Sequence, residues 1–152
     1  MNKKNFLRLL AIMMVATLSV SLVSCSSDDD EEDYGSGPLA GRWEANKSYV
    51  SSEGDKLQGT FTLTFKNDNF TYVSKWSSPG EKDDIETYTG PYVIEDNIVL
   101  MTFTRLEDDG SPWYSDNYVF KFEINGKTLT LTANDRETRE YWGTSPMVYT
   151  KK

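Results

Sequence analysis

Hydrophobic and polar residues alternate along most of residues 39–152, with the period of two that is typical of half-buried β-strands. The segment GTFTLTFK is the clearest case, because its apolar residues fall on one face and its threonines on the other. Three further segments, NFTYVSKW, NYVFKFEI and KTLTLTA, repeat the pattern. The side chains predicted to point inward from these four strands are Phe61, Leu63, Phe65, Phe70, Tyr72, Trp76, Tyr118, Phe120, Phe122, Ile124, Leu129 and Leu131.

More strands are predicted at residues 43–50, 86–94, 98–104 and 147–151, which makes about eight, and no segment after residue 25 shows a convincing helical period. Asn125-Gly126 predicts a tight type I′ hairpin, and residues 67–69 and 95–97 are rich in turn-forming residues. The longer connections are predicted to be loops at residues 77–84, 105–116 and 133–146. We therefore expect an all-β fold, an antiparallel up-and-down meander that closes into a barrel over residues 39–152. A barrel of this size is either filled by side chains or holds one small ligand.

The first 24 residues are typical of an export signal that is cleaved from the mature protein. Lys3, Lys4 and Arg8 give it a positive start, and residues 9–23 are apolar except for three hydroxyl side chains. The alternative is a transmembrane anchor, but this apolar run is short for a membrane span and is interrupted by the hydroxyl groups. The sequence thus favours a cleaved helical signal peptide over residues 1–24.

The only cysteine stands at the end of this apolar run, in Leu22-Val23-Ser24-Cys25. This motif resembles the bacterial lipobox, which implies diacylation of Cys25, cleavage before it and acylation of the new amine. Three acyl chains, at about 0.8 kcal/mol per buried CH₂, would hold the protein on a membrane almost irreversibly. With one cysteine there is no intrachain disulfide.

An acidic block follows Cys25 and begins the segment that leads to the barrel. Consecutive like charges repel and stay solvated, so residues 25–38 are predicted to form the lipidated cysteine and a disordered linker. The block is either a simple spacer or an address. Together with the lipobox it resembles the lipoprotein export signal of Bacteroidetes, which implies display on the outer face of the outer membrane. Its residues are Ser26, Ser27, Asp28, Asp29, Asp30, Glu31, Glu32 and Asp33.

Charge and the missing residue types exclude several functions. All 24 acidic residues follow Cys25 and three of the 16 basic ones precede it, so the mature charge is 13 − 24 = −11. Such a surface argues against binding nucleic acid or anionic lipid. The chain has no histidine and no phosphate-binding motif, which excludes Ser–His and Cys–His catalysis. Paired acids occur only in predicted turns, and DDGSPWYSDN lacks EF-hand spacing, so we expect no catalytic residues, metal or cofactor and no enzyme.

The start of the predicted barrel carries a family resemblance. Gly41-Arg42-Trp43 resembles the Gly-x-Trp of lipocalins, and residues 39–152 resemble the small lipocalin-like lipoproteins of Bacteroidetes. The resemblance implies a lipocalin-like barrel in which Gly41 and Trp43 are structural, with the indole packed at the closed end. The domain is shorter than a full lipocalin and lacks both a Thr-Asp-Tyr-type motif and a C-terminal helix.

Aromatic residues at or beyond the predicted strand ends are the main functional lead. They either cap the barrel or form a contact surface, and two loops at one end would let them stack on a sugar ring or cover a hydrophobic ligand. A cavity above about 300 Å³ would favour a surface lipoprotein that binds a small hydrophobic or glycan ligand. A filled barrel would favour the alternative, a protein-interaction module such as an inhibitor or accessory subunit of an unidentified partner. The candidate contacts are Trp76, Trp113, Tyr114, Tyr141 and Trp142.

Overall fold

The computed structural model describes residues 32–107 and 109–152, so the predicted signal peptide, Cys25 and the acidic block as far as Glu31 lie outside the described residues. Residues Asp33–Lys152 form one compact unit. Its elements are β1 (Gly41–Val50), β2 (Lys56–Lys66), β3 (Asn69–Ser77), β4 (Asp84–Glu95), β5 (Ile98–Leu106), β6 (Pro112–Asn125), β7 (Thr128–Ala133), α2 (Arg136–Trp142) and β8 (Met147–Lys151).

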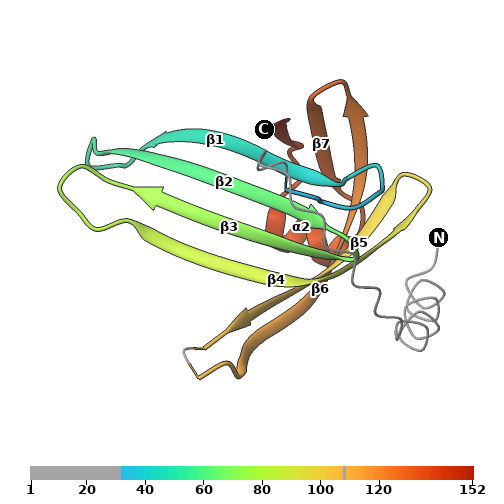
Figure 1. Cartoon of the computed structure of the whole chain (residues 1–152). Coiled ribbons are helices and arrows are strands. Elements are labelled where there is room, and N and C mark those ends of the chain that lie inside the picture. Colours follow the sequence, from blue (N-terminus) through green and yellow to red (C-terminus); the bar gives the residue numbers. More distant parts are fainter. Residues whose placement is uncertain (1–31, 108) are drawn as a thin grey trace. The chain divides into compact units, whose positions relative to one another are not determined.

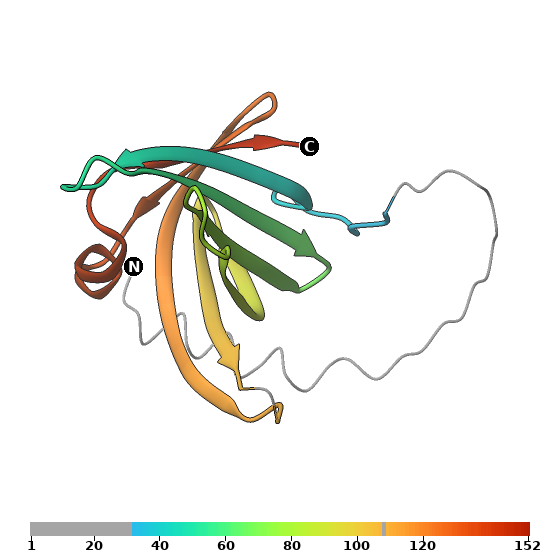
Figure 2. The same cartoon turned by 90° about the vertical axis from the view of Figure 1, so that its left-hand side faces the viewer.

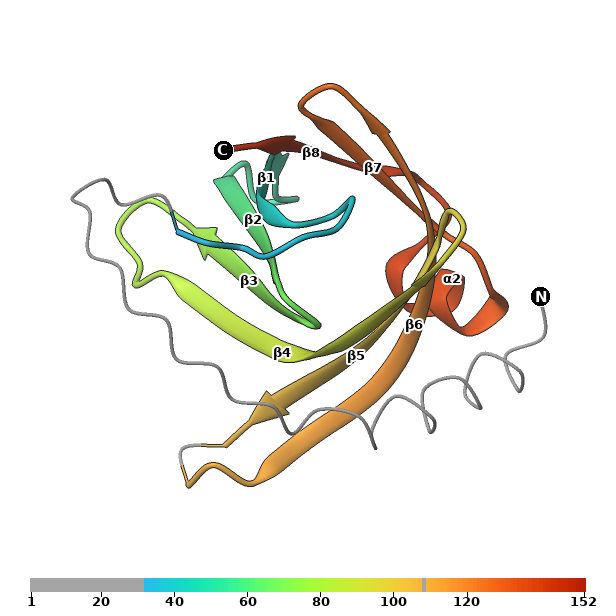
Figure 3. The same cartoon turned by 45° about the vertical axis from the view of Figure 1, so that its right-hand side comes forward.

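The eight strands form a closed antiparallel barrel in which each strand pairs with its neighbours in the sequence. Closure is made by β8 against β1, where Trp43 pairs with Lys151 and Glu44 with Thr150. Figures 1 and 3 show the strands wrapping around a common interior, with α2 beside β6. The predicted all-β, up-and-down barrel is confirmed. All described strands and the described core lie within this unit, so Asp33–Lys152 has a hydrophobic core of its own, as a domain that folds alone requires.

Connections in such a meander alternate between the two ends of the barrel. One end, which we call the mouth, carries the β1–β2, β3–β4 and β5–β6 connections and the segment containing α2. The opposite end, which we call the closed end, carries the short turns around Asn67, Asp96 and Gly126. In Figure 2 the turns at the mouth extend well beyond the region where the strands close on one another.

The core fills the closed-end half of the barrel. Phe65, Phe120 and Leu129 are at most 1% exposed, as their strand parity predicted. Three predicted inward residues are not fully buried. Phe61 and Trp76 are only partly buried, because they lie toward the mouth, and Ile124 is 38% exposed, because it stands one residue from the closed-end turn. Alternation sets which face a side chain takes, but not how far along the strand the core reaches.

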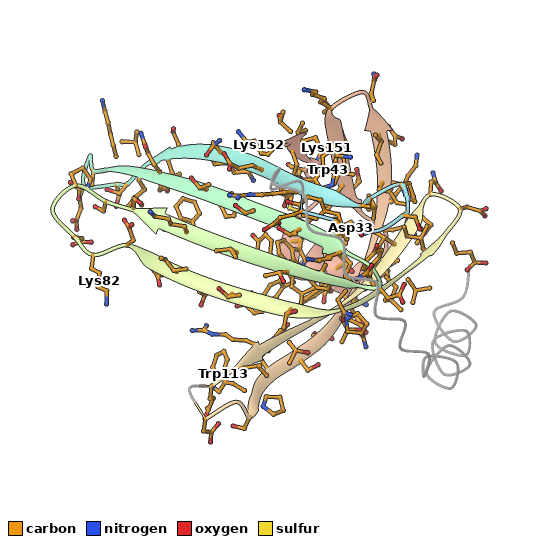
Figure 4. All side chains as sticks on the ribbon, in the orientation of Figure 1. Asp33, Trp43, Lys82, Trp113, Lys151 and Lys152 are labelled. Carbon is orange, nitrogen blue, oxygen red and sulfur yellow. The ribbon has the colours of Figure 1, made fainter. Side chains whose placement is uncertain are left out.

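Trp43 lies in this core and ties the start of the barrel to its end. Its Nε1–H donates to the Leu39 carbonyl over 2.8 Å, and Lys151 Nζ lies 5.1 Å from the ring centroid. Gly41 has φ +128°, and a Cβ there would lie 2.8 Å from Lys151 Cε. Figure 4 shows Trp43 close to Lys151 and Lys152, at the end of the chain. Both residues therefore have structural contacts at the closed end.

The connections differ from the sequence-based expectation in two places. Residues 136–142 form helix α2, although the whole segment 133–146 was expected to be a loop. Strands β5 and β6 extend to Leu106 and from Pro112, so most of the expected loop 105–116 is a long hairpin. Helix α2 has only seven residues and no complete apolar face, so it left no helical period in the sequence.

Strand β4 comes unusually close to β5 at Gly90-Pro91. A Cβ on Gly90 would lie only 1.8 Å from the carbonyl oxygen of Thr102. Only glycine permits this approach, and proline, which has no N–H, follows it in the strand. The close approach lies between Tyr88 on the mouth side and Tyr92 on the side of the closed end.

Candidate functional site

Helix α2 is fixed across the mouth by its own capping groups and by β6. The Asp135 carboxylate caps the first turn by accepting from the Thr138 N–H over 2.8 Å. Thr138 is fully buried, and its Oγ1 accepts from the Val119 N–H of β6, also over 2.8 Å. Gly143, at φ +82°, ends the helix, with its N–H bonded to the Arg139 carbonyl. The last helical residues are thereby held at one position over the barrel interior.

Trp142, at the end of α2, inserts its indole among the aromatic side chains of the mouth. Its ring centroid lies 5.3 Å from that of Phe103, 5.5 Å from that of Tyr72 and 5.8 Å from that of Tyr118. The neighbouring Tyr141 stacks on Tyr118 at 5.2 Å. Contacts of this type are worth about 0.5–1.5 kcal/mol each beyond the burial of area. The helix is therefore held to the barrel largely by its two terminal aromatic residues.

Two hollows lie beside this indole. The first, which we call the aromatic chamber, has a volume of about 210 Å³. The second has a volume of about 180 Å³ and adjoins it, because Tyr72, Tyr141 and Trp142 line both. Each is smaller than the ~300 Å³ of the usual ligand pocket, so an occupant of either one is limited to about a single ring. The chamber is lined by Tyr72, Ser74, Glu86, Tyr88, Phe103, Tyr114, Tyr118, Tyr141 and Trp142.

Polar groups converge on the aromatic chamber. Glu86 forms an ion pair with Arg105 and accepts from the Tyr88 hydroxyl over 3.3 Å. The hydroxyls of Tyr114 and Tyr118 are hydrogen-bonded to each other. In the described part of the chain, Trp142 Nε1 is the one buried side-chain nitrogen or oxygen with no hydrogen-bond partner. Because a buried donor without an acceptor costs about 1–3 kcal/mol, this N–H marks where a ligand acceptor would be favourable.

Four tyrosines of the chamber have a raised pKa and are neutral at physiological pH. Burial raises the pKa of Tyr72 and of Tyr118 far above the usual value of 10. Burial also raises the pKa of Tyr88, with a smaller effect from the Glu86 carboxylate, and that of Tyr114. Phenol groups that stay protonated can both donate and accept hydrogen bonds. The lining is thus a set of neutral hydroxyls and aromatic faces with one carboxylate.

Three of the five aromatic residues singled out in the sequence meet here: Tyr114, Tyr141 and Trp142. They lie on β6 and on α2 rather than in loops, which corrects the expected element but not the expected end of the barrel. The other two lie apart. Trp76 packs edge-on against Phe61 at 5.3 Å, and Trp113 packs against Arg105, whose guanidinium carbon lies 5.0 Å from the ring centroid.

Sequence reasoning missed Ser74, Glu86 and Tyr88, and it assigned Tyr72 and Tyr118 only to the core. One signal was present. Ser74 is a buried polar residue on the inward face of β3, between Tyr72 and Trp76, where an apolar side chain is expected. A small hydroxyl at such a position indicates space inside the barrel. No comparable signal marks Glu86, whose place at the chamber depends on how β4 pairs with β3.

The described residues of the paired acids lie in turns or at strand ends, at the two ends of the barrel. Asp83 forms an ion pair with Lys75 at 2.7 Å, and Asp109 accepts from the backbone and hydroxyl of Ser111. Over residues 32–107 and 109–152, no three metal-ligating side chains come together. Within the same ranges, no helix is long and apolar enough to cross a membrane. Glu32 and Asp33, the described end of the acidic block, are exposed.

Comparison of the chain with protein-family models, with curated proteins and with solved structures gives no match. The class of this protein therefore follows from its geometry: it is a small eight-stranded up-and-down β-barrel with an aromatic chamber at its mouth. This architecture is consistent with a lipocalin-like fold, and the family resemblance carried by Gly41 and Trp43 stays a prediction.

Proposed function

We propose that this barrel binds a small ligand, hydrophobic or glycan, in the aromatic chamber. The observation that carries the proposal is the buried, unpartnered Nε1–H of Trp142, a residue whose side chain lines that chamber. Buried donors in a barrel filled by its own side chains normally have acceptors. An unpaired donor on a residue beside a hollow therefore favours a ligand. Volume alone does not favour a ligand, since neither hollow reaches ~300 Å³. The hydrogen-bonding groups and aromatic rings that line the chamber favour a ligand.

A blocking substitution tests this proposal. Ser74 is buried in the chamber wall, so Ser74→Leu would place an apolar side chain in the hollow. The matched control is Val73→Leu, on the neighbouring residue of β3 and on the opposite face. Native mass spectrometry of the barrel purified from its own host should show a co-purified small molecule with wild type and the control, and none with Ser74→Leu. An unliganded wild-type mass, or the same bound mass in Ser74→Leu, would contradict the proposal.

We further propose that the barrel is carried on a lipid-anchored outer-membrane protein displayed at the cell surface. Support comes from the lipobox-like residues 22–25 and from the acidic block that follows. Cys25→Ala should abolish incorporation of labelled palmitate and leave the protein unprocessed or mislocalised. Palmitate in the mutant chain would refute lipidation at this residue.

Display is tested separately from lipidation. Replacing residues 28–33 with Ala and Ser, with residues 22–25 intact, should keep the lipid but remove the protein from the reach of external protease in a Bacteroidetes host. Unchanged digestion on intact cells would show that the acidic block is a spacer and not an address.

A second function, docking of a protein partner at the mouth, is favoured by a different observation. Exposed apolar side chains gather around the mouth, and such patches often mark interaction surfaces. Figure 4 shows Trp113 at the far end of the β5–β6 hairpin. Co-purification of a protein instead of a small molecule would favour this alternative. The residues are Tyr49, Val50, Ile85, Leu106, Trp113, Tyr141 and Val148, each at least 51% exposed.

A further inference from the structure

The lining of the aromatic chamber defines the class of ligand more closely. We propose that the chamber binds a neutral ring bearing several hydroxyl groups, about the size of one sugar unit, in preference to an apolar ring. This inference rests on the proposed function, because it concerns the occupant of the same site. It follows from the size, the faces and the hydrogen-bonding groups of the chamber.

Size limits the occupant to one ring. A volume of about 210 Å³ corresponds to about seven water molecules at ~30 Å³ each. This is enough for one six-membered ring with its substituents and too little for an extended acyl chain. A longer glycan would place one terminal unit in the chamber and the rest outside the mouth.

The walls offer flat aromatic faces to such a ring. Tyr114 and Tyr141 lie nearly parallel, with 24° between their planes and 6.5 Å between their centroids. Tyr88 meets Tyr114 almost at right angles, at 83°. The negatively charged face of an aromatic ring attracts the weakly positive C–H groups on the face of a saturated ring. The faces alone suit a sugar and an apolar ring equally well.

The polar groups of the chamber favour a hydroxylated ring over an apolar ring. Trp142 Nε1–H is a donor that needs an acceptor, and Glu86 is an acceptor with lone pairs beyond those used by Arg105 and Tyr88. A hydroxyl group both accepts and donates, so a ring with several hydroxyls can satisfy both ends of the chamber. Because Arg105 pairs with Glu86, the net charge beside the chamber is small, so neither an anion nor a cation gains much from it. A purely cationic ligand would also leave the Trp142 donor unpaired.

The magnitude of this selection follows from the cost of unpaired groups. An apolar ring leaves the Trp142 donor unpaired and removes water from the Glu86 carboxylate without replacing it. Each such loss weakens binding by roughly five- to 150-fold. Because the apolar contacts are similar for both rings, the hydroxylated ring should bind at least tenfold more tightly.

The experiment is a matched comparison of two kinds of probe on purified Asp33–Lys152, by isothermal titration calorimetry. One kind is a panel of methyl glycosides of glucose, galactose, mannose and N-acetylglucosamine. The other is methoxycyclohexane, which has a six-membered ring and the methoxy group but no hydroxyls. At least one glycoside should bind with a Kd of roughly 0.1–10 mM, weaker than the natural ligand that co-purifies, because a single sugar unit makes only part of that ligand's contacts. Methoxycyclohexane should bind at least tenfold more weakly.

Two variants connect the preference to its proposed cause. Trp142→Phe keeps an aromatic ring but removes the donor, and Glu86→Gln removes the charge of the acceptor. Each should weaken glycoside binding by about tenfold or more and should not weaken methoxycyclohexane binding. The matched control is Trp76→Phe, the same substitution outside the chamber lining, which should change neither. Circular dichroism should be measured for every variant to check that the barrel is folded.

The outcomes separate this inference from the proposed function. If methoxycyclohexane binds as tightly as every glycoside, or if Trp142→Phe and Glu86→Gln leave glycoside affinity unchanged, the ligand class is wrong while a binding chamber remains. If no glycoside in the panel binds but methoxycyclohexane does, the ligand class is also wrong. If neither kind of probe binds and no small molecule co-purifies with the barrel, the inference and the proposed function both fail.

Discussion

Gly90 offers the sharpest test of how the barrel is built, because a single added carbon meets a backbone atom there. A Cβ at this residue would lie 1.8 Å from the Thr102 carbonyl oxygen, and real Cβ atoms essentially never come closer than 3.0 Å to such a group. Strands β4 and β5 would therefore have to separate by more than an ångström in Gly90→Ala. Overpacking of this kind costs about 1–3 kcal/mol, and each weakened ladder hydrogen bond adds about 1 kcal/mol. The expected loss is about 3–5 kcal/mol.

Urea unfolding of Asp33–Lys152, followed by tryptophan fluorescence, measures this loss. With a denaturant dependence of about 1–3 kcal/mol/M, the midpoint should fall by roughly 1–5 M. Gly80→Ala is the matched control, because its residue has φ +83° but nothing within 4 Å of the added carbon. The expected cost of Gly80→Ala is only that of holding an alanine at a positive φ, about 1–2 kcal/mol. If Gly90→Ala proves no more damaging than Gly80→Ala, the close approach of β4 to β5 is wrong.

Three further predictions concern the core, the helix and the buried tyrosines. Phe65→Ala should lower the free energy of unfolding by about 3–5 kcal/mol, and Thr64→Ala, on the opposite face of β2, by less than about 1 kcal/mol. Equal urea midpoints for the two variants would refute the strand register. Thr138→Val leaves the Val119 N–H without its acceptor, so hydrogen exchange should speed up selectively in α2, and unchanged exchange would refute its anchoring to β6. Because a raised pKa favours the neutral phenol in the folded state, stability is fully present below pH ~10 and falls above it. Absorbance at alkaline pH should show late ionisation, coincident with unfolding, of Tyr72, Tyr118 and Tyr149.

Much of this fold could be predicted because strand parity is local information. The alternation in GTFTLTFK placed Leu63 and Phe65 inside, and Asn125-Gly126 marked a real turn between β6 and β7. Short connections then left a meander as the simplest topology. The resulting eight-stranded closed barrel needed no long-range information beyond the order of strands.

The site was harder to predict because it depends on tertiary position. Helix α2 has caps that the sequence does show, Asp135 before it and Gly143 after it, but its seven residues are too few for a period. Trp142 reaches the barrel interior because α2 is anchored there, both by the bond of Thr138 to the backbone of β6 and by the ring contacts of its last two residues. Pairing of the β5–β6 hairpin directs Tyr114 into the chamber and leaves Trp113 61% exposed on its outer part, although the two are adjacent in the sequence. The aromatic residues of the sequence indicated three that line the chamber, Tyr114, Tyr141 and Trp142, but not the others.

The indole N–H of Trp142 reports binding in the aromatic chamber at a single atom, because it has no hydrogen-bond partner until a ligand binds. The chain has four tryptophans, so a ¹H–¹⁵N spectrum of Asp33–Lys152 should show four indole signals, assigned by single Trp→Phe substitutions. Titration with the methyl glycosides and with methoxycyclohexane should move the Trp142 signal. The signal should move downfield for a probe that accepts a hydrogen bond from the indole N–H. The Trp43 signal, already bonded to Leu39, is the internal reference and should stay in place. If no probe of either kind moves the Trp142 signal, or if all four signals move together, the aromatic chamber is not a binding site.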